Sequence, residues 1–151
     1  MLIHQLTRDE CLEVLSRATI GRLACARGDQ PYIVPISLHF DGTAGLYSFS
    51  TVGQKIHWMR DNPKVCIETD EVVDRFHWTS VVVTGMYEEL DNSDRHRDDL
   101  KRAIESLQRR SEWWLPGAAE IVSGEAHPAT VIYRVRISDV SGRRAARAAS
   151  R

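Results

Sequence analysis

The architecture of this chain follows most directly from one segment, Gly45-Leu-Tyr-Ser-Phe-Ser-Thr-Val-Gly-Gln-Lys-Ile-His-Trp-Met-Arg-Asp-Asn-Pro-Lys-Val-Cys66. Residues 47–50 have the aromatic and alternating character of a strand. A short helix is expected to begin around Ser50, Thr51 and Gly53. Asn62-Pro63 ends that helix before a second strand. The segment therefore predicts a strand, a hydroxyl-rich turn, a short helix and another strand.

The start of this helix has the features of an anion site. Free backbone N–H groups at a helix start attract anions, and Lys55 in the first turn adds a full positive charge. A lysine is mildly unfavourable there against the helix dipole, and a bound anion would offset that cost. The alternative is an ordinary cap followed by a solvated lysine. The Gly-x-x-x-x-Gly-Lys pattern is absent, which excludes a nucleotide-triphosphate loop.

Composition indicates one compact soluble domain. The chain has 151 residues, of which 42% are hydrophobic and 27% charged, and its net charge of −1 gives no general attraction to nucleic acid or to acidic membranes. We expect no membrane association, because no apolar run approaches the roughly 20 residues that span a bilayer. The start of the chain does not resemble a secretion signal. Three widely spaced cysteines favour free thiols in a reducing cytoplasm.

The remaining pattern predicts a mainly β fold. Apolar residues at every second position and short turns such as Asp41-Gly42 indicate antiparallel hairpins. Gly85 follows a valine run and is expected to mark a bulge or bend. The expected strands are residues 19–26, 30–40, 44–50, 64–69, 76–90 and 129–140. Six strands in hairpins favour a closed or nearly closed antiparallel barrel with helices packed outside it.

Two further helices are expected besides the short one. Thr7-Arg-Asp-Glu10 matches a capping box at the start of the first. The second follows the caps offered by residues 91–94 and presents Leu100, Ile104 and Leu107 on one face. We expect a single domain over residues 1–142, followed by a basic, frayed tail over residues 143–151. A contact of this tail with nucleic acid or a membrane is the weaker alternative.

Several segments together resemble a known family. They are Ile20-Gly-Arg-Leu-Ala24, Gln30-Pro-Tyr-Ile-Val-Pro-Ile-Ser37, residues 46–55 with Asn62-Pro-Lys-Val65, Trp78-Thr-Ser-Val-Val-Val-Thr-Gly85 and Val135-Arg-Ile-Ser-Asp-Val-Ser-Gly-Arg143. In order and spacing the chain resembles the pyridoxamine 5'-phosphate oxidase-like flavin-binding split barrels, especially their small nitroimidazole-resistance and flavin-nucleotide-binding members. The resemblance implies a six-stranded antiparallel split β-barrel of Greek-key type with two to three peripheral α-helices.

The resemblance also implies a homodimer that holds FMN in grooves at the subunit interface. The isoalloxazine edge would lie against four residues, Val34, Pro35, Ile36 and Ser37. The ribityl-phosphate end would be held by Ser50, Thr51, Gln54 and Lys55. Residues of the long strand would approach from the same or the other subunit, namely Trp78, Thr79 and Ser80. An apolar slot, N–H donors and a positive phosphate seat are what a flavin requires.

Departures from the family pattern limit the expected activity. Gln54 stands where the resembling oxidases carry an arginine before the lysine, and the tail has arginines but no tryptophan. We therefore do not expect oxidation of pyridoxamine phosphate. The expected function is an FMN-dependent oxidoreductase that transfers hydride or electrons to an unknown small molecule, with no catalytic residue assigned. The alternative is a non-catalytic binding or carrier module, and FAD, a deazaflavin or haem are alternatives to FMN.

Other candidate sites are weaker. No histidine pair has a metal-ligand spacing with a carboxylate or cysteine, so no metal site is expected. His39 and His77 lie on strands near the proposed ring slot, and a structural role is favoured over a catalytic one for both. Trp113 and Trp114 are interpreted either as an aromatic lid or, preferably, as packing against the barrel or a partner subunit.

Overall fold

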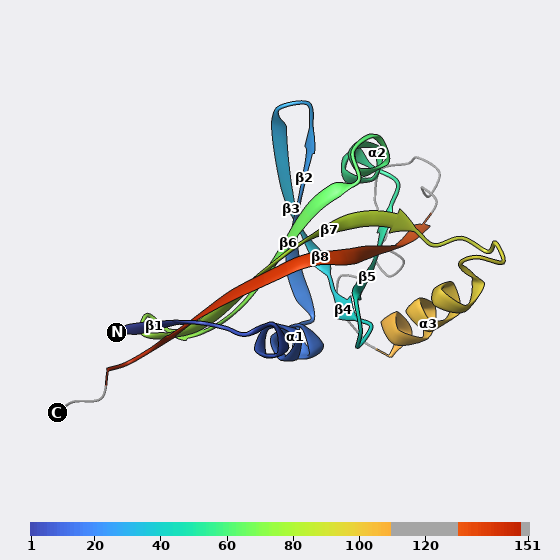
Figure 1. The fold of residues 1–151 in the computed structure, drawn as a ribbon. Helices are drawn as coiled ribbons and strands as arrows, with labels where there is room; N and C mark the ends of the chain where they lie inside the picture. The colour runs from blue at the N-terminus through green and yellow to red at the C-terminus, as the bar shows by residue number, and fades with distance from the viewer. Residues whose placement is uncertain (110–129, 149–151) are drawn as a thin grey trace, which may run out of the picture.

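The computed structural model describes residues 1–109 and 130–148, which form eight strands and three helices (Figure 1). The strands are β1 (Leu2–Gln5), β2 (Ile20–Arg27), β3 (Gln30–Ser37), β4 (His39–Phe40), β5 (Gly45–Thr51), β6 (Lys64–Asp74), β7 (His77–Glu89) and β8 (Thr130–Ala146). The helices are α1 (Arg8–Arg17), α2 (Gln54–Asp61) and α3 (Arg97–Gln108).

All strands belong to one antiparallel sheet that does not close. Its order is β3-β2-β6-β7-β8-β5-β4, with β1 paired to the far end of β8. The two ends of this path approach each other, and the Ser48 hydroxyl on β5 donates to the Ser37 carbonyl of β3 at 2.6 Å. The expected mainly β split barrel with peripheral helices is therefore confirmed.

The expected count of six strands is wrong, because the structure has eight. The expected strand over residues 30–40 divides into β3 and β4 at Leu38, whose backbone N–H donates to the Thr19 carbonyl. Val34, Ile36, Leu38 and Phe40 all still contact the core, so alternation alone concealed the break. The other added strand, β1, is exposed along its whole length and has no alternating pattern to detect.

The core fills the inside of the curled sheet. It contains the inward residues of every long strand and the buried faces of α1 and α2. Val81 and Val83 on β7 and Tyr133 and Val135 on β8 are all fully buried. A smaller cluster of Tyr47, Leu90 and Ala103 fixes α3 against the outer face of β5.

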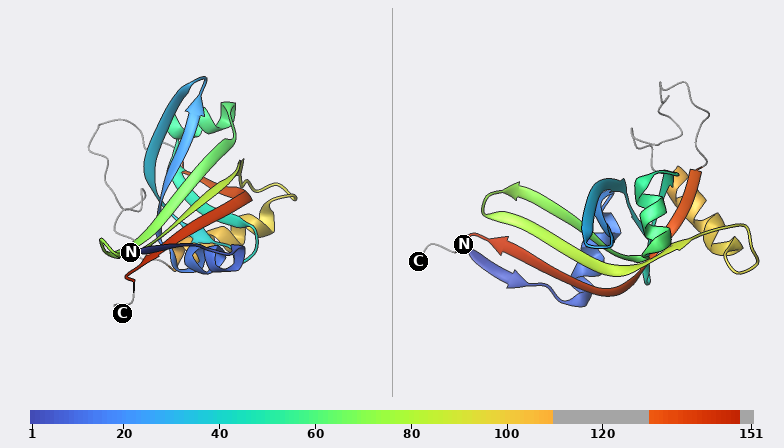
Figure 2. Two further views of the ribbon diagram at one scale, coloured as in Figure 1. Left: turned by 60° about the vertical axis from the view of Figure 1, so that its left-hand side comes forward. Right: turned by 90° about the horizontal axis from the view of Figure 1, so that it is seen from above.

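A long arm extends from this body (Figures 1 and 2). It is built from β1, the end of β8 and the β6–β7 hairpin, which turns between Asp74 and His77. Residues 143–146 pair with β1, and residues 143–145 also pair with β7, so the sheet continues beyond residue 142, where a frayed tail was expected. The expected tail contained no alternating pattern that would have shown this.

Several local predictions are confirmed. The Thr7 capping box is present, with the Glu10 carboxylate accepting the Thr7 N–H at 2.8 Å. The β7–β8 register shifts between Thr84 and Gly85, and a Cβ at Gly85 would lie 2.2 Å from the Arg136 carbonyl oxygen. The N-cap of α3, however, is His96 rather than one of residues 91–94.

Candidate functional site: the β3, β5 and α2 corner

The strand expected to line the ring presents alternate residues to its two faces. Val34 and Ile36 point into the core, and Ile36 is buried. Pro35 and Ser37 lie on the opposite face, with Pro35 exposed. Since no strand among the described residues pairs with the outer edge of β3, part of its backbone is open to hydrogen bonding. A ring on this outer face would contact the side chains of Pro35 and Ser37, and only the backbone of Val34 and Ile36.

The same face carries one residue that the sequence analysis missed. Arg22 on β2 is the register partner of Pro35, and directly opposed residues share a face of the sheet. Its guanidinium donates to Glu68 at 3.2 Å and to Asp70 at 2.9 Å. These bonds hold a positive charge beside the exposed side of β3. In the sequence, Arg22 could have been recognised as a site residue because it interrupts the small and apolar run Ile20-Gly-Arg-Leu-Ala24.

The hydroxyls at the end of β5 are placed differently from each other. Ser50 is buried and its hydroxyl donates to the Thr51 carbonyl at 2.8 Å, so this hydroxyl already has a partner within the strand end. Thr51 is half-buried and lies three residues before Gln54, the first residue of α2. Neither hydroxyl caps the helix. The N-cap is Gly53, which has no side chain to offer.

The start of α2 therefore keeps its backbone donors free of a side-chain cap. Gln54 is exposed, whereas Lys55 is half-buried. The Lys55 ammonium makes no ion pair or hydrogen bond with any residue that the structure describes. Burial lowers the pKa of Lys55, and the neighbouring Cys25 opposes this shift. An anion at this corner would restore the solvation that burial removes from the lysine.

Two contacts fix α2 on the β2–β3 hairpin. The Trp58 and Tyr32 rings pack with their centroids 5.6 Å apart. At the end of the helix, the Asn62 amide donates to the Ala26 carbonyl at 3.2 Å. Because the helix is held at both points, the position of Lys55 relative to β3 is set by the fold.

The three predicted residues on β7 lie elsewhere in the sheet. Ser80 pairs with Asp70 on β6, and β2 and β3 lie beyond that strand. This places Ser80 three strand positions from β3, which corresponds to about 14 Å along the sheet. Thr79 is buried and accepts a hydrogen bond from Arg144, while Trp78 is half-buried toward the arm. Within one chain, these residues do not join the corner formed by β3, β5 and α2.

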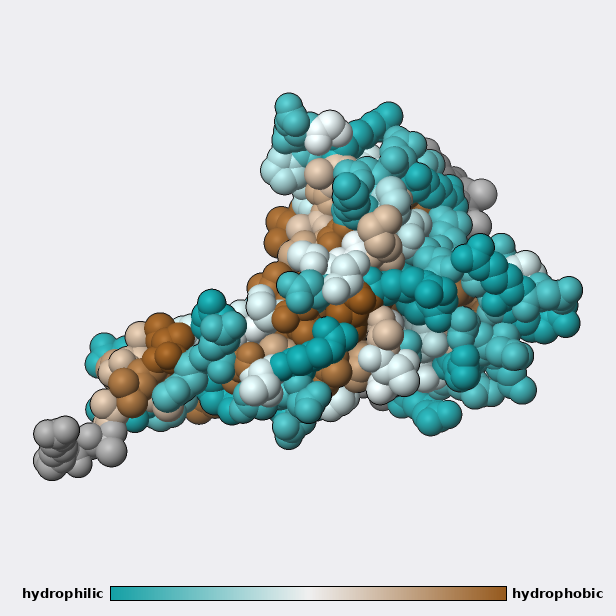
Figure 3. Space-filling model, viewed as in Figure 1, coloured by the Kyte–Doolittle hydropathy of each residue, from teal (hydrophilic) through white to brown (hydrophobic). Residues whose placement is uncertain are grey.

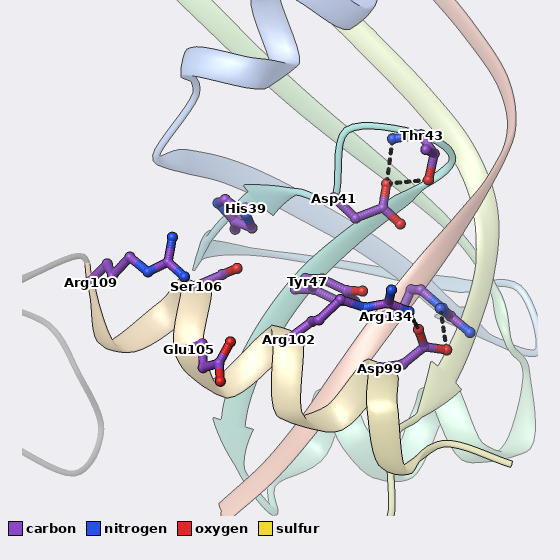
Figure 4. A pocket seen from close by; sticks show the side chains of 10 residues that line it. All are labelled: His39, Asp41, Thr43, Tyr47, Asp99, Arg102, Glu105, Ser106, Arg109 and Arg134. Carbon is purple, nitrogen blue, oxygen red and sulfur yellow. Dashed lines mark hydrogen bonds and ion pairs between the residues drawn. The ribbon is translucent and has the colours of Figure 1, made fainter.

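A pocket between α3 and the β4–β5 hairpin was not foreseen (Figure 4). We call it the α3 pocket. Its volume is about 390 Å³, and its charged lining residues are Asp41, Asp99, Arg102, Glu105, Arg109 and Arg134. His39 also lines it and stacks on Tyr47 with ring centroids 6.3 Å apart. None of the residues predicted to hold the cofactor lines this pocket.

One wall of the α3 pocket is a buried ion-pair network. Arg134 is only 8% exposed and donates to Asp99 at 2.9 Å and to Glu88 at 2.9 Å. Burial opposes ionisation of Glu88, but hydrogen bonds from Arg136, Arg134 and His96 outweigh it and lower the pKa of Glu88 to about 2. Arg134 lies between the apolar residues Tyr133 and Val135 in an alternating strand, a position that alternation alone would assign to a solvated face. The signal that identifies its burial is Glu88 directly opposite it across β7 and β8.

The remaining candidates give no further site. No group of three or more potential metal ligands occurs among residues 1–109 and 130–148. His77 is held by Asp74 at the arm tip, away from β3. Trp113 and Trp114 lie outside the described residues. No helix in the described parts of the chain is long and apolar enough to cross a membrane.

An open antiparallel split barrel with this corner defines the class of protein. A family model described as pyridoxamine 5'-phosphate oxidase matches residues 7–144, and the chain belongs to this family. It is 40% identical over 147 residues to an uncharacterized protein of Rhizobium meliloti (strain 1021), an alignment that covers 96% of this chain and 97% of that relative.

Solved structures share the fold. A FAD-binding protein from Mesorhizobium loti is 40% identical, with a TM-score of 0.81, and the match covers 97% of this chain and 100% of that one. A FAD binding protein from Mycobacterium smegmatis is 22% identical, with a TM-score of 0.67 and coverage of 97% and 100%. A NimC/NimA family protein from Clostridium acetobutylicum is 20% identical, with a TM-score of 0.54 and coverage of 94% and 87%.

Proposed function

We propose that this chain binds a flavin, with its phosphate at the start of α2 and its ring along the outer face of β3. The observation that carries the proposal is Lys55, which is half-buried beside the uncapped helix start and has no counter-ion among the described residues. A phosphate would meet both the free N–H donors and this ammonium. Pro35 and Ser37 supply the adjoining surface for the ring. The 40% identity to a FAD-binding protein along nearly the whole chain supports the same assignment.

The described corner accounts for the FMN portion of a flavin. FMN and FAD share the tricyclic ring, the ribityl chain and the first phosphate, so both could use Lys55 and β3. We propose FMN as the resident cofactor, because the corner offers one lysine and one helix start, which suit one phosphate. The FAD-binding relatives make FAD the alternative to test.

We further propose that the flavin lies between two copies of the chain. Trp78, Thr79 and Ser80 are three strand positions from β3 within one chain, so a second copy is required if they are to reach the same ring. The arm that carries them exposes Val72 by 66% and Val73 by 83%. Apolar residues gather along the arm in Figure 3, as expected of a surface that packs against another chain.

The phosphate seat is tested by cofactor retention. We expect the purified protein to be yellow and to release FMN on denaturation, identified by mass and chromatography against FAD. Lys55→Ala should weaken FMN binding by about 10- to 100-fold, the range of a charge-assisted hydrogen bond. Lys64→Ala removes an exposed lysine of β6 and serves as the matched control. Equal FMN affinity of the Lys55 variant and the control would contradict the proposal that Lys55 binds the phosphate.

The proposed activity is oxidoreduction of a small molecule. A bound flavin supplies hydride and electron transfer, and the chain would position it and limit access to its ring. Oxidation of pyridoxamine phosphate is not proposed, because Gln54 is neutral and exposed at the corner. Anaerobic mixing with NADH, NADPH or a reduced deazaflavin should bleach the bound flavin faster than free FMN. A rate equal to that of free FMN would instead favour a carrier without turnover.

A further inference from the structure

The α3 pocket contains polar groups that the fold itself leaves unused. Tyr47 is 3% exposed, and its hydroxyl makes no hydrogen bond with any residue in the described parts of the chain. Figure 4 shows this hydroxyl pointing along the pocket toward Arg102 and Arg134. Burial raises the pKa of Tyr47, so the hydroxyl keeps its proton and is available as a donor. Because Tyr47 lines the pocket, this unpaired hydroxyl can donate to a ligand that offers an acceptor.

Two opposite charges at the C-terminal end of α3, Glu105 in the helix and Arg109 at its C-cap, are also unpaired. Glu105 and Arg109 are four residues apart and both face the pocket, a spacing at which such side chains commonly pair. Here neither makes an ion pair or side-chain hydrogen bond within residues 1–109 and 130–148. Both remain available to a ligand, one as an acceptor and the other as a donor.

The charges of the whole pocket balance. Three carboxylates and three guanidiniums line it, from Asp41, Asp99, Glu105, Arg102, Arg109 and Arg134. Arg134 is committed to Asp99 and Glu88, and Asp41 accepts the backbone N–H groups of Thr43 and Ala44 through one oxygen. A dianion such as phosphate would meet the carboxylates of Glu105 and Asp41 and be repelled. A ligand with one positive and one negative group can satisfy both signs.

We propose that the α3 pocket binds a small zwitterion, a molecule of the amino acid class with one ammonium and one carboxylate. Arg109 binds the carboxylate, Glu105 binds the ammonium, and the Tyr47 hydroxyl donates to the polar end that reaches the base of the pocket. A volume of about 390 Å³ is sufficient for a molecule of this size. The proposal is independent of flavin binding, because no predicted cofactor residue lines the pocket.

Four matched probes test the charge requirement by calorimetry on the full chain. L-Norleucine and 6-aminohexanoate are isomers that carry both charges at different separations, whereas hexanoate and hexylamine each carry one. At least one zwitterion should bind about tenfold more tightly than both single-charge probes, because each charged hydrogen bond contributes about that factor. Hexanoate, hexylamine or inorganic phosphate binding as tightly as the better zwitterion would overturn the proposal, as would no binding by any probe.

Three variants separate the two charges and the hydroxyl. Arg109→Gln should weaken both the zwitterion and hexanoate about tenfold, whereas Glu105→Gln should weaken the zwitterion and hexylamine but not hexanoate. Tyr47→Phe keeps the buried ring and should weaken the zwitterion about fivefold. Lys101→Gln, which removes a positive charge from α3 outside this pocket, should leave binding unchanged. Equal effects of Arg109→Gln and Lys101→Gln would indicate a general charge effect and overturn the assignment.

Flavin content distinguishes failure of this proposal from failure of the proposed function. The titrations are run with and without saturating FMN, and bound flavin is read from its absorbance in the same samples. Zwitterion binding without flavin would support the pocket alone. Flavin retention without zwitterion binding would overturn the pocket and leave the corner at Lys55 intact.

Discussion

The β6–β7 hairpin runs through the body and the arm, and its valines are buried in the body but exposed in the arm. In the body, Val81 and Val83 have no exposed surface. At the arm, on the same hairpin, Val72 is 66% and Val73 is 83% exposed. Both regions pair through the backbone with neighbouring strands, and each has one register shift, between Val72 and Asp74 in the arm and between Thr84 and Gly85 in the body. Backbone pairing therefore does not distinguish them. The difference is that the body curls around a core, and the arm projects beyond it.

This contrast separates stability from association. Burial of apolar side chains stabilises the body by about 1.5 to 3 kcal/mol for each large residue. The arm gains little from its valines within one chain, and exposed apolar clusters of this kind mark contact surfaces. The body should therefore determine the free energy of unfolding, while the arm should determine association with another chain.

The largest expected effect is a core truncation in the body. Ile67 on β6 is 1% exposed, and Ile67→Ala should lower the free energy of unfolding by about 3 kcal/mol through lost burial and a cavity. Val73→Ala on the same strand should change it by less than about 0.5 kcal/mol. Urea denaturation of dilute protein measures both values. Similar losses from the two variants would mean that the arm is part of the folded core.

Ion pairs allow the same comparison at acidic pH. Glu88 in the body is 15% exposed on its side chain, and its pKa falls from 4.5 to about 2 because hydrogen bonds from arginines and His96 outweigh burial. The folded chain thus keeps this carboxylate ionised where the unfolded chain already binds a proton. Its stabilising contribution is present above about pH 4.5 and is lost as the pH falls toward 2, a change of about 3 kcal/mol.

Glu71 is the matched position in the arm. It pairs with Arg17, and its side chain is 41% exposed, so solvent screens the pair. Stability measured by urea denaturation between pH 5 and pH 3 should fall less steeply in Glu88→Gln than in the unaltered chain. Glu71→Gln should retain most of the original slope. If the slopes of the two variants match, the buried network around Arg134 is not the source of acid sensitivity.

Sequence predicted the body better than the arm for a physical reason. Alternation at residues such as Tyr133 and Val135 records burial against a core, and these residues are buried as expected. β1 is exposed along its whole length. Residues 143–146, which pair with it, bury Ala145 but have no large apolar residues at alternate positions. Neither segment therefore has a hydrophobic periodicity that predicts a strand. Irregular features with their own turn chemistry, such as the Asp41-Gly42 hairpin turn, were also predictable.

Of the two candidate sites, the corner at Lys55 could be predicted from the sequence and the α3 pocket could not. The helix start at Lys55 follows from local sequence, because a strand, a cap position and a helix stop occur in order. The α3 pocket does not, because it needs His39 and Tyr47 from one hairpin and Arg109 from a helix far along the chain. The burial of Arg134 is likewise not visible in the alternating pattern of β8. It follows from the strand pairing, which places Glu88 opposite Arg134 and lets the two side chains form an ion pair.

The smallest expected effect concerns association through the arm. If a second copy covers the arm, Val73→Asp places a charge in an apolar contact and should raise the dimer dissociation constant about tenfold. Val73→Ala should raise it less, because it removes area without adding charge. Analytical ultracentrifugation over a range of concentrations measures both constants.

Flavin retention links this association to the cofactor site. In Val73→Asp, retention should fall with the dimer content, because the proposed contacts from Trp78 to Ser80 come from the other chain. Lys55→Ala should instead lower flavin retention without dissociating the dimer. Loss of dimer with full flavin retention would place the whole cofactor site within one chain.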